Sequence, residues 1–144
     1  VKAVLSPLGT SKGALFTILK HFTPDVLVVV TSKQAAENLP EILEKAGFDG
    51  KHHVMLVEDP FTGVDEVEKV VNGARRYLEE NNVNEVVINL TGGTSLLGYM
   101  VERIREGIRH GRKITTVLAV DRRPYEEQKA NPYVVGEILE LPRR

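Results

Sequence analysis

The feature of this 144-residue chain that most constrains its fold is a regular alternation of two patterns. Short apolar runs alternate with segments in which apolar residues recur at the spacing of a helix. Five runs rich in Val, Ile and Leu alternate only weakly between apolar and polar residues, as strands do when helices cover both faces of a parallel sheet. These runs occupy residues 2–5, 25–31, 52–58, 85–90 and 114–120. They predict buried parallel strands.

Between these runs, apolar residues recur at the three- and four-residue spacing of a helix. Three such stripes are formed by Leu15, Ile18, Leu19 and Phe22, by Val67, Val70, Val71, Ala74 and Leu78, and by Leu97, Met100, Val101, Ile104 and Ile108. A further helix over residues 33–46 is less regular, because Pro40 either kinks it or marks its start. Gly47 is expected to end this helix.

Five strands separated by four helices predict a Rossmann-like α/β fold, a doubly wound parallel sheet of strand order 3-2-1-4-5. The length suits a single domain over residues 1–144. Because the chain begins at Val1 rather than Met, we expect a trimmed chain or a domain of a longer protein. After Asp121, residues 122–132 indicate a turn-rich excursion, and residues 133–141 predict a C-terminal antiparallel strand or hairpin with a bulge at Gly136.

Charge and composition argue against several classes of protein. Nineteen Lys and Arg residues nearly balance twenty Asp and Glu residues, so the chain lacks the positive field that tracks long nucleic acids. The absence of cysteine excludes disulfides and thiolate zinc sites and agrees with a cytoplasmic location. No run predicts a membrane span or a signal peptide. We therefore expect a cytoplasmic protein that needs no metal or cofactor and can hold a small anion in a local pocket.

Two loops rich in Gly, Ser and Thr are predicted to meet. In a doubly wound sheet, ligands bind beyond the carboxyl ends of the strands, where the strand order reverses. The predicted order makes the first and fourth strands neighbours there, which brings together "SPLGTSKG" (6–13) and "TGGTS" (91–95). Glycine amides and helix N-termini favour a phosphate, and Lys12 adds a cation. For either loop alone, glycine turns and Ser or Thr helix caps without any ligand are the favoured interpretation; the predicted meeting of the two loops reverses that preference.

Neither loop matches the phosphate-binding motifs of common nucleotide enzymes. No G-x-G-x-x-G follows the first strand, and no G-x-x-x-x-G-K-[ST] occurs in the chain. The sequence therefore argues against an ordinary dehydrogenase or NTPase.

The two loops together resemble those of the CARF domains, the CRISPR-associated Rossmann-fold sensors of type III antiviral defence. The resemblance is carried by "SPLGTS" (6–11) and by "NLTGGT" (89–94) running into an apolar helix, and it covers nearly the whole chain. It implies a homodimer whose paired sheet ends form a cleft for cyclic oligoadenylate, often cyclic tetraadenylate. A symmetric ring on a two-fold axis would meet two equivalent half-sites.

The resemblance also implies which residues face the ligand. These are Leu8, Gly9, Thr10 and Ser11 in the first loop, and Thr91, Gly92, Gly93, Thr94 and Ser95 in the fourth. We add Lys12, Asp121 and Arg122, because their positions place them at the same end of the sheet.

Some family members cleave their ligand without a metal, by attack of a ribose 2′-OH on the adjacent phosphate. Candidates for such chemistry here are Ser11, Lys12 and Ser95. Many family sequences carry a lysine directly after T-G-G-T, where this chain has Ser95, and this departure favours binding over cleavage.

The leading hypothesis is a binding module, a cyclic oligoadenylate sensor that stands alone or belongs to an effector whose other domain lies outside this chain. One alternative is a metal-independent ring nuclease of the same fold. Another is the ligand-binding regulatory domain of a transcription factor.

Two further patterns have simpler interpretations than a second active site. "REGIRH" (105–110) fits the R-x4-H motif of HEPN ribonucleases, but it lies on a predicted helix without a helical domain around it. We interpret it as a basic helix end. His52 and His53 could be combined with Glu58 and Asp59 into a metal site, but adjacent strand residues point to opposite faces of a sheet.

Overall fold

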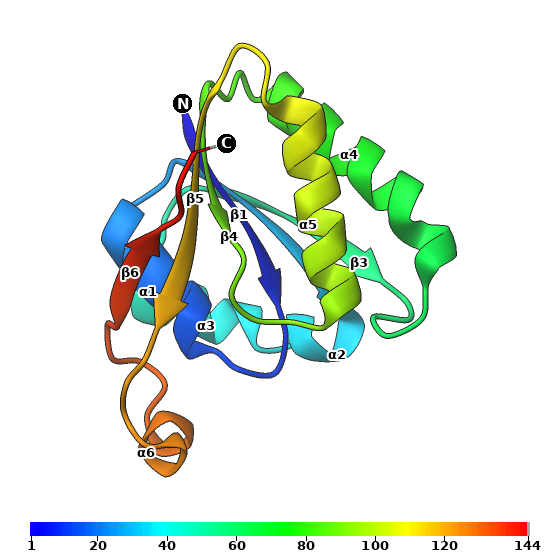
Figure 1. The fold of residues 1–144 in the computed structure, drawn as a ribbon. Helices are drawn as coiled ribbons and strands as arrows, with labels where there is room; N and C mark the ends of the chain where they lie inside the picture. The colour runs from blue at the N-terminus through cyan, green and yellow to red at the C-terminus, as the bar shows by residue number, and fades with distance from the viewer. Residues whose placement is uncertain (144) are drawn as a thin grey trace.

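The computed structural model describes residues 1–143 and contains a six-stranded sheet of order β3-β2-β1-β4-β5-β6 (Figure 1). The strands are β1 (Lys2–Leu8), β2 (Val26–Ser32), β3 (Lys51–Val57), β4 (Glu85–Asn89), β5 (Lys113–Val120) and β6 (Glu137–Glu140). The first five strands are parallel, and β6 runs antiparallel to β5. The predicted doubly wound sheet, its strand order and its antiparallel C-terminal strand are confirmed.

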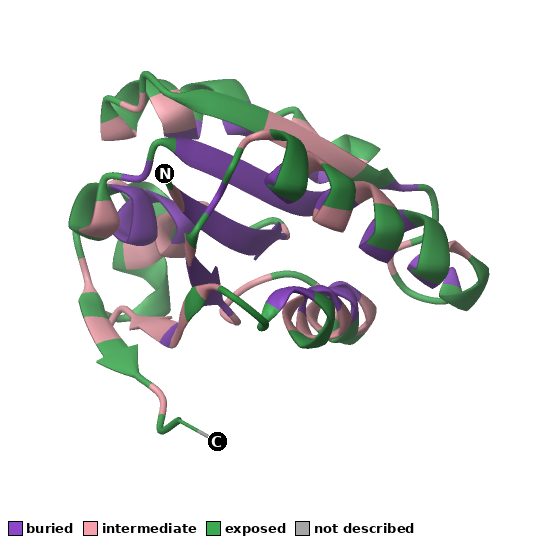
Figure 2. Cartoon of the chain, turned by 90° about the horizontal axis from the view of Figure 1, so that it is seen from above, coloured by how far each residue is buried: buried purple, intermediate pink, exposed green. Residues whose placement is uncertain are grey.

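Helices cover both faces of this sheet. They are α1 (Gly13–Phe22), α2 (Lys33–Ala36), α3 (Leu39–Ala46), α4 (Val67–Glu80), α5 (Ser95–Ile108) and α6 (Tyr125–Ala130), with a 3-10 turn η1 (Val64–Glu66) before α4. One core lies between the sheet and α4 and α5, and a second lies between the sheet and α1 and α3. Figure 2 shows the buried residues concentrated in the central strands and on the sides of the helices that face them.

The three predicted apolar stripes all face the sheet. The five stripe residues of α4 and the five of α5 are buried, as are Leu15, Ile18 and Leu19 of α1, while Phe22 packs at the margin of its core. On β1, Val4 contributes to the core under α1 and Leu5 to the core under α5, because successive strand residues point to opposite faces.

The structure corrects two predicted elements. The helix predicted over 33–46 is two helices, because Pro40 lies in the first turn of α3 and marks a new start. Gly47 ends α3 with a φ of 67°, as predicted. The strand predicted over 133–141 is wrong in its first half: only Glu137–Glu140 pairs with β5, and the predicted bulge at Gly136 lies before the strand.

Residues 131–136 depart from the sheet because they pack onto α1 instead. The Tyr133 ring meets the Phe16 ring edge-on, with centroids 5.4 Å apart, and the Gly136 N–H donates to Thr17 Oγ1 at 3.0 Å. The excursion before this segment contains the short helix α6; a solvated turn or helix is the simplest interpretation of residues 126–129 in the sequence, and the structure has the helix. In residues 1–143, no helix is long and apolar enough to cross a membrane.

Candidate functional site

The loops after β1 and β4 lie in direct contact, as the strand order predicts. A Cβ added to Gly9 would lie 2.8 Å from both Cα and N of Gly93, so only a glycine at position 9 allows this approach. Gly92 and Gly93 have φ angles of 102° and 77°, which side-chain-bearing residues rarely adopt. The glycines therefore serve a backbone-to-backbone junction at the strand ends.

Asn89, which the sequence reasoning did not select, holds the β4 loop in shape. Its side chain is buried, and its Nδ2 donates to Ser6 Oγ and to the Thr91 carbonyl, both at 2.9 Å. Its Oδ1 accepts from the Thr91 N–H at 2.9 Å. Thr91 Oγ1 in turn accepts from the Ala119 N–H of β5 at 2.9 Å. A polar residue at the end of an otherwise apolar strand is the signal that could have identified Asn89.

Two more of the predicted ligand-facing residues, Thr94 and Leu8, have structural partners inside the protein. Thr94 is the N-cap of α5: its hydroxyl accepts from the Leu97 N–H at 3.3 Å and donates to the Pro60 carbonyl. The Leu8 side chain is only 1% exposed and packs in the core, while its carbonyl accepts from Thr31 Oγ1 at 2.6 Å. Only the backbone of Leu8 could face a ligand.

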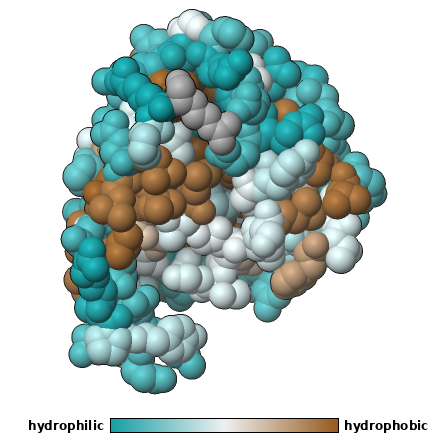
Figure 3. Space-filling model, in the orientation of Figure 1, coloured by the Kyte–Doolittle hydropathy of each residue, from teal (hydrophilic) through white to brown (hydrophobic). Residues whose placement is uncertain are grey.

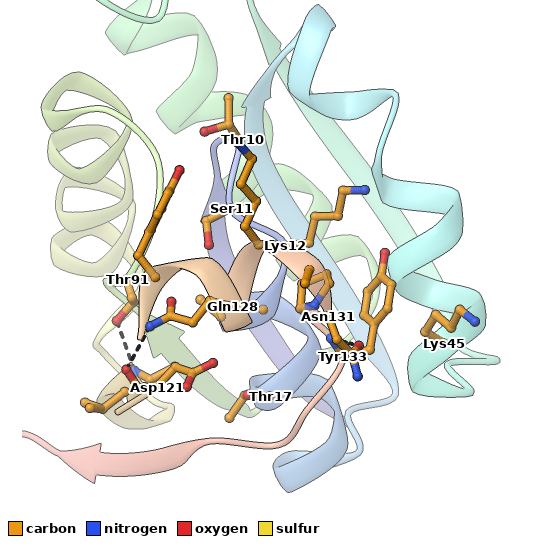
Figure 4. Close-up of a pocket in the computed structure, with 18 of the residues that line it drawn as sticks. Thr10, Ser11, Lys12, Thr17, Lys45, Thr91, Asp121, Gln128, Asn131 and Tyr133 are labelled. Carbon is orange, nitrogen blue, oxygen red and sulfur yellow. Dashed lines mark hydrogen bonds between the residues drawn. The ribbon is translucent and has the colours of Figure 1, made fainter. Parts of the chain in front are cut away.

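A cavity of about 690 Å³ lies beyond the carboxyl ends of β1 and β5, enclosed by α1, α3, α6 and the segment after α6 (Figure 4). Five of the predicted site residues line it: Thr10, Ser11, Lys12, Thr91 and Asp121. The remaining predicted residues lie outside this lining: Leu8, Gly9, Gly92, Gly93, Thr94, Ser95 and Arg122. The structure therefore divides the predicted residues into five that line the cavity, called the cavity group below, and seven that lie outside its lining.

The most extensive addition to the predicted site comes from α6 and the residues that follow it. Tyr125, Gln128, Asn131 and Tyr133 all line the cavity, and the sequence reasoning selected none of them. In the view of Figure 4, Thr91 and Asp121 lie on one side, Lys12 and Tyr133 on the other, and Gln128 between them. A six-residue helix gives no apolar stripe, so no periodic signal was available.

The N-terminus of α1 opens onto this cavity. Gly13 and Ala14 belong to its lining, the first turn contains no acidic residue, and within residues 1–143 no side chain caps the first amides. The N-terminus of α5 is instead capped by Thr94. Free amides and the positive end of the helix dipole make the start of α1 the better place for an anionic group.

A cation, a carboxylate and a phenol meet on the α3 side of the cavity. Lys12 Nζ lies 3.7 Å from a carboxylate oxygen of Glu41, and the Tyr133 hydroxyl donates to the same oxygen. The hydrogen bond from Tyr133, and then the charge of Lys12, lower the pKa of Glu41. Burial and the neighbouring Glu41 raise the pKa of Tyr133, so the phenol keeps its proton. The Lys45 ammonium lies 5.8 Å from the Tyr133 ring centroid.

On the opposite side, Asp121 is held by a neighbour in the chain. Arg123 donates to both of its carboxylate oxygens, with Nη2 to Oδ2 at 2.7 Å, and this hydrogen bonding lowers the pKa of Asp121. Arg122 points elsewhere and forms an ion pair with Glu137 of β6. Asp121 therefore braces the turn after β5.

The remaining sequence patterns do not form a second site. Arg105 pairs with Glu102 and Glu106, and exposed His110 follows the C-terminal end of α5, away from the T-G-G-T loop at its other end. The His53 ring stacks on the Tyr77 ring, with centroids 4.5 Å apart. Within residues 1–143, no group of three or more His, Cys, Asp and Glu residues is placed to hold a metal.

Strand order and site geometry define a Rossmann-like domain whose cavity lies at the switch point of the sheet. Solved structures with a similar fold include two with bound cyclic nucleotides. One is Enterococcus italicus Csm6 bound to cyclic hexa-2′-fluoro-hexa-dAMP, with a TM-score of 0.67, 14% identity and 99% of this chain covered. The other is Can2 from Sulfobacillus thermosulfidooxidans in complex with cyclic tetra-adenylate, with a TM-score of 0.61, 12% identity and 83% of this chain covered.

These similarities establish the fold. The chain folds like Csm6 and Can2, both CARF-domain proteins of type III CRISPR systems, in agreement with the resemblance of its loops. It corresponds to only 42% of the Csm6 chain and 32% of the Can2 chain. No protein-family model matches the sequence, and no curated protein matches it significantly.

Proposed function

We propose that this chain is a sensor domain that binds cyclic oligoadenylate where the β1 and β4 loops meet. The observation that carries the proposal is the cavity at the switch point, which combines the uncapped N-terminus of α1 with Lys12. This combination suits the phosphate of a nucleotide. The fold shared with two proteins solved with such rings supports a ring as the ligand. The absence of cysteine agrees with a cytoplasmic location for the sensor.

We propose further that the ring is cyclic tetraadenylate and that two copies of the chain share it. A cavity of about 690 Å³ has the size of a site for one small ligand, so one copy would accommodate only part of a four-nucleotide ring. The junction glycines, Gly92 and Gly93, together with Ser95, lie beside the cavity group and would face the part of the ring outside it.

An incompletely covered sheet face supports this dimer. Leu118 of β5 points away from α1, because its neighbours Val117 and Ala119 pack on the α1 side. Leu118 pairs with Leu139 of β6, and Leu139 is 44% exposed. Figure 3 shows an apolar area over β5 and β6. Apolar area of this kind is typical of a contact with another protein surface.

The proposal is tested with purified protein and cyclic tetraadenylate in excess EDTA. Thermal unfolding measures binding, and chromatography of the nucleotide measures cleavage. We expect a rise in the melting temperature that grows with ring concentration, while the ring stays intact. Lys12→Met should lose most of this rise, whereas Lys20→Met, on the exposed side of α1, should retain it. An unchanged melting temperature at saturating ring concentration would overturn the proposal.

A ring nuclease is the second candidate, and one observation favours particular residues for it. Ser11 and Lys12 both line the cavity, whereas Ser95 lies outside the lining. If the chain cleaves its ligand, the Lys12 ammonium would stabilise charge on the attacked phosphate. Linear products that form in EDTA and disappear with Lys12→Met would support this second function.

A further inference from the structure

The amide of Gln128 has its orientation fixed by the protein. Its Nε2 donates to two backbone carbonyls, to that of Asp121 at 3.2 Å (Figure 4) and to that of Arg123 at 2.7 Å. Both amide protons are thereby used, and the two acceptors determine which end of the amide is nitrogen. The remaining end of this half-buried side chain, Oε1, has no protein donor among residues 1–143, and Gln128 belongs to the cavity lining.

Most of the other side-chain oxygens around the cavity either accept a hydrogen bond from the protein or belong to hydroxyls that can both donate and accept. Glu41 accepts from Tyr133 and pairs with Lys12, and Asp121 accepts from Arg123. The hydroxyl oxygens of two lining threonines accept from backbone N–H groups, that of Thr17 from Gly136 and that of Thr91 from Ala119. The hydroxyls of Thr10 and Ser11 can donate or accept, so they do not distinguish a donor from an acceptor on a ligand. Glu41 Oε2 remains a charged acceptor on the α3 side of the cavity, and Gln128 Oε1 is a fixed neutral acceptor on the α6 side.

Asn131 supplies a fixed donor close to it along the chain. Its Oδ1 accepts from the Tyr133 N–H at 3.1 Å, so the Nδ2 end is free to donate. Gln128 and Asn131 are three residues apart at the end of α6, and both line the cavity. Asn131 is the C-cap of α6 and has an extended backbone with a φ of −142°, so it begins the segment that follows the helix.

A fixed acceptor is the complement of the 6-amino group of adenine, which donates hydrogen bonds. Guanine presents a carbonyl oxygen at the place of the amino group, and this oxygen would face Gln128 Oε1 without a proton between them. Cytosine shares the pattern of adenine, so the choice of adenine rests on the proposed function.

We propose that Gln128 selects adenine, by accepting a hydrogen bond from the 6-amino group of one base of the bound ring. The residue does so while its nitrogen holds the turn after β5, which fixes the acceptor in place before the ligand arrives.

The test compares two rings by titration calorimetry: cyclic tetraadenylate, and the analogue in which unsubstituted purine replaces adenine and the amino group is absent. Wild type should bind the adenine ring roughly 5- to 10-fold more tightly for each occupied pocket, the usual effect of one neutral hydrogen bond. Gln128→Met, of similar size but without an acceptor, should bind both rings alike. Lys129→Met, a lining neighbour, should leave the ratio of the two affinities unchanged.

The outcomes distinguish selection of adenine by Gln128 from a purely structural role of Gln128 in the turn after β5. If Gln128 only holds the turn, Gln128→Met weakens both rings equally and keeps the wild-type ratio, which overturns the inference. Equal binding of both rings by wild type overturns it as well, while the proposed function stands. If neither ring binds wild type, the proposed function fails, and the inference fails with it.

Discussion

Two glycines, Gly9 and Gly98, differ in whether the structure leaves room for a side chain. Gly9 is in contact with the backbone of Gly93, so no side chain can be added there without separating the β1 and β4 loops. Gly98 lies inside α5, and an added Cβ would have no heavy atom within 4 Å. The same residue type is thus required at the junction and dispensable in the helix.

Alanine substitutions should therefore change stability in opposite directions. Gly98→Ala should raise the free energy of unfolding by about 0.5–1 kcal/mol, because alanine favours a helix. Gly9→Ala should lower it by roughly 1–3 kcal/mol, because the methyl group overlaps the Gly93 backbone. Urea unfolding of both variants measures the two effects, and a neutral Gly9→Ala variant would mean that the two loops are not held in contact.

The hydrogen bond between Tyr133 and Glu41 predicts a pH dependence. The pKa of Glu41 lies below its ordinary value of 4.5, so its contribution to stability is present above pH 4.5 and is lost as the pH falls through the lowered value. Tyr133→Phe removes the largest cause of that lowering, and NMR titration should show the Glu41 pKa moving up towards 4.5. The variant should be less stable than wild type at pH 7, with the difference shrinking in acid. A Glu41 pKa that does not move would contradict the contact.

At the scale of elements, Thr94 determines how α5 begins. Its hydroxyl caps the helix and also reaches the Pro60 carbonyl in the loop before α4. Thr94→Val, which removes the hydroxyl at nearly constant volume, should lower the free energy of unfolding by about 1 kcal/mol. Thr94→Ser retains the oxygen and should recover most of that loss. Chemical denaturation measures both, and equal losses in the two variants would show that the hydroxyl is not the stabilising group.

The long elements could be predicted from the sequence because each buries a regular set of apolar residues. The stripes of α4 and α5 and the five parallel strands follow from this periodicity, and the strand order then places the two glycine-rich loops together. Residues 122–136 could not be predicted in this way. α6 buries no residue, and the segment after it is placed by distant partners, Phe16 and Thr17 of α1.

Because α6 and the following segment form one wall of the cavity, the residues selected from the sequence make up only the part of the lining next to the strand ends. The sequence reasoning selected the loop residues and Lys12, but it omitted Gln128 and Asn131, whose roles depend on hydrogen bonds to the backbone. It also placed Thr94 towards a ligand, whereas the structure gives its hydroxyl to the protein. Residue type and spacing indicate which groups a loop contains but not which partners use them.

At the scale of the whole molecule, the apolar face of β5 and β6 predicts association. Leu139→Lys places a charge on that face at a position already 44% exposed, so the fold should tolerate it. We expect wild type to be dimeric and Leu139→Lys to shift towards monomer, as measured by light scattering after size exclusion. Leu56→Lys, at an exposed position on the opposite edge strand β3, is the matched control. A monomeric wild type at high concentration would contradict the shared cleft.

The most direct test of the account is a calorimetric titration of the protein with cyclic tetraadenylate, with linear tetraadenylate as the comparison. We predict saturable binding of one ring to two chains, weaker binding of the linear form, and loss of most of the affinity for the ring in Lys12→Met. The account would be contradicted if ring concentrations well above that of the protein gave no heat of binding and no competition between the ring and the linear form. The chain would then have no cyclic oligoadenylate site at the junction of the β1 and β4 loops.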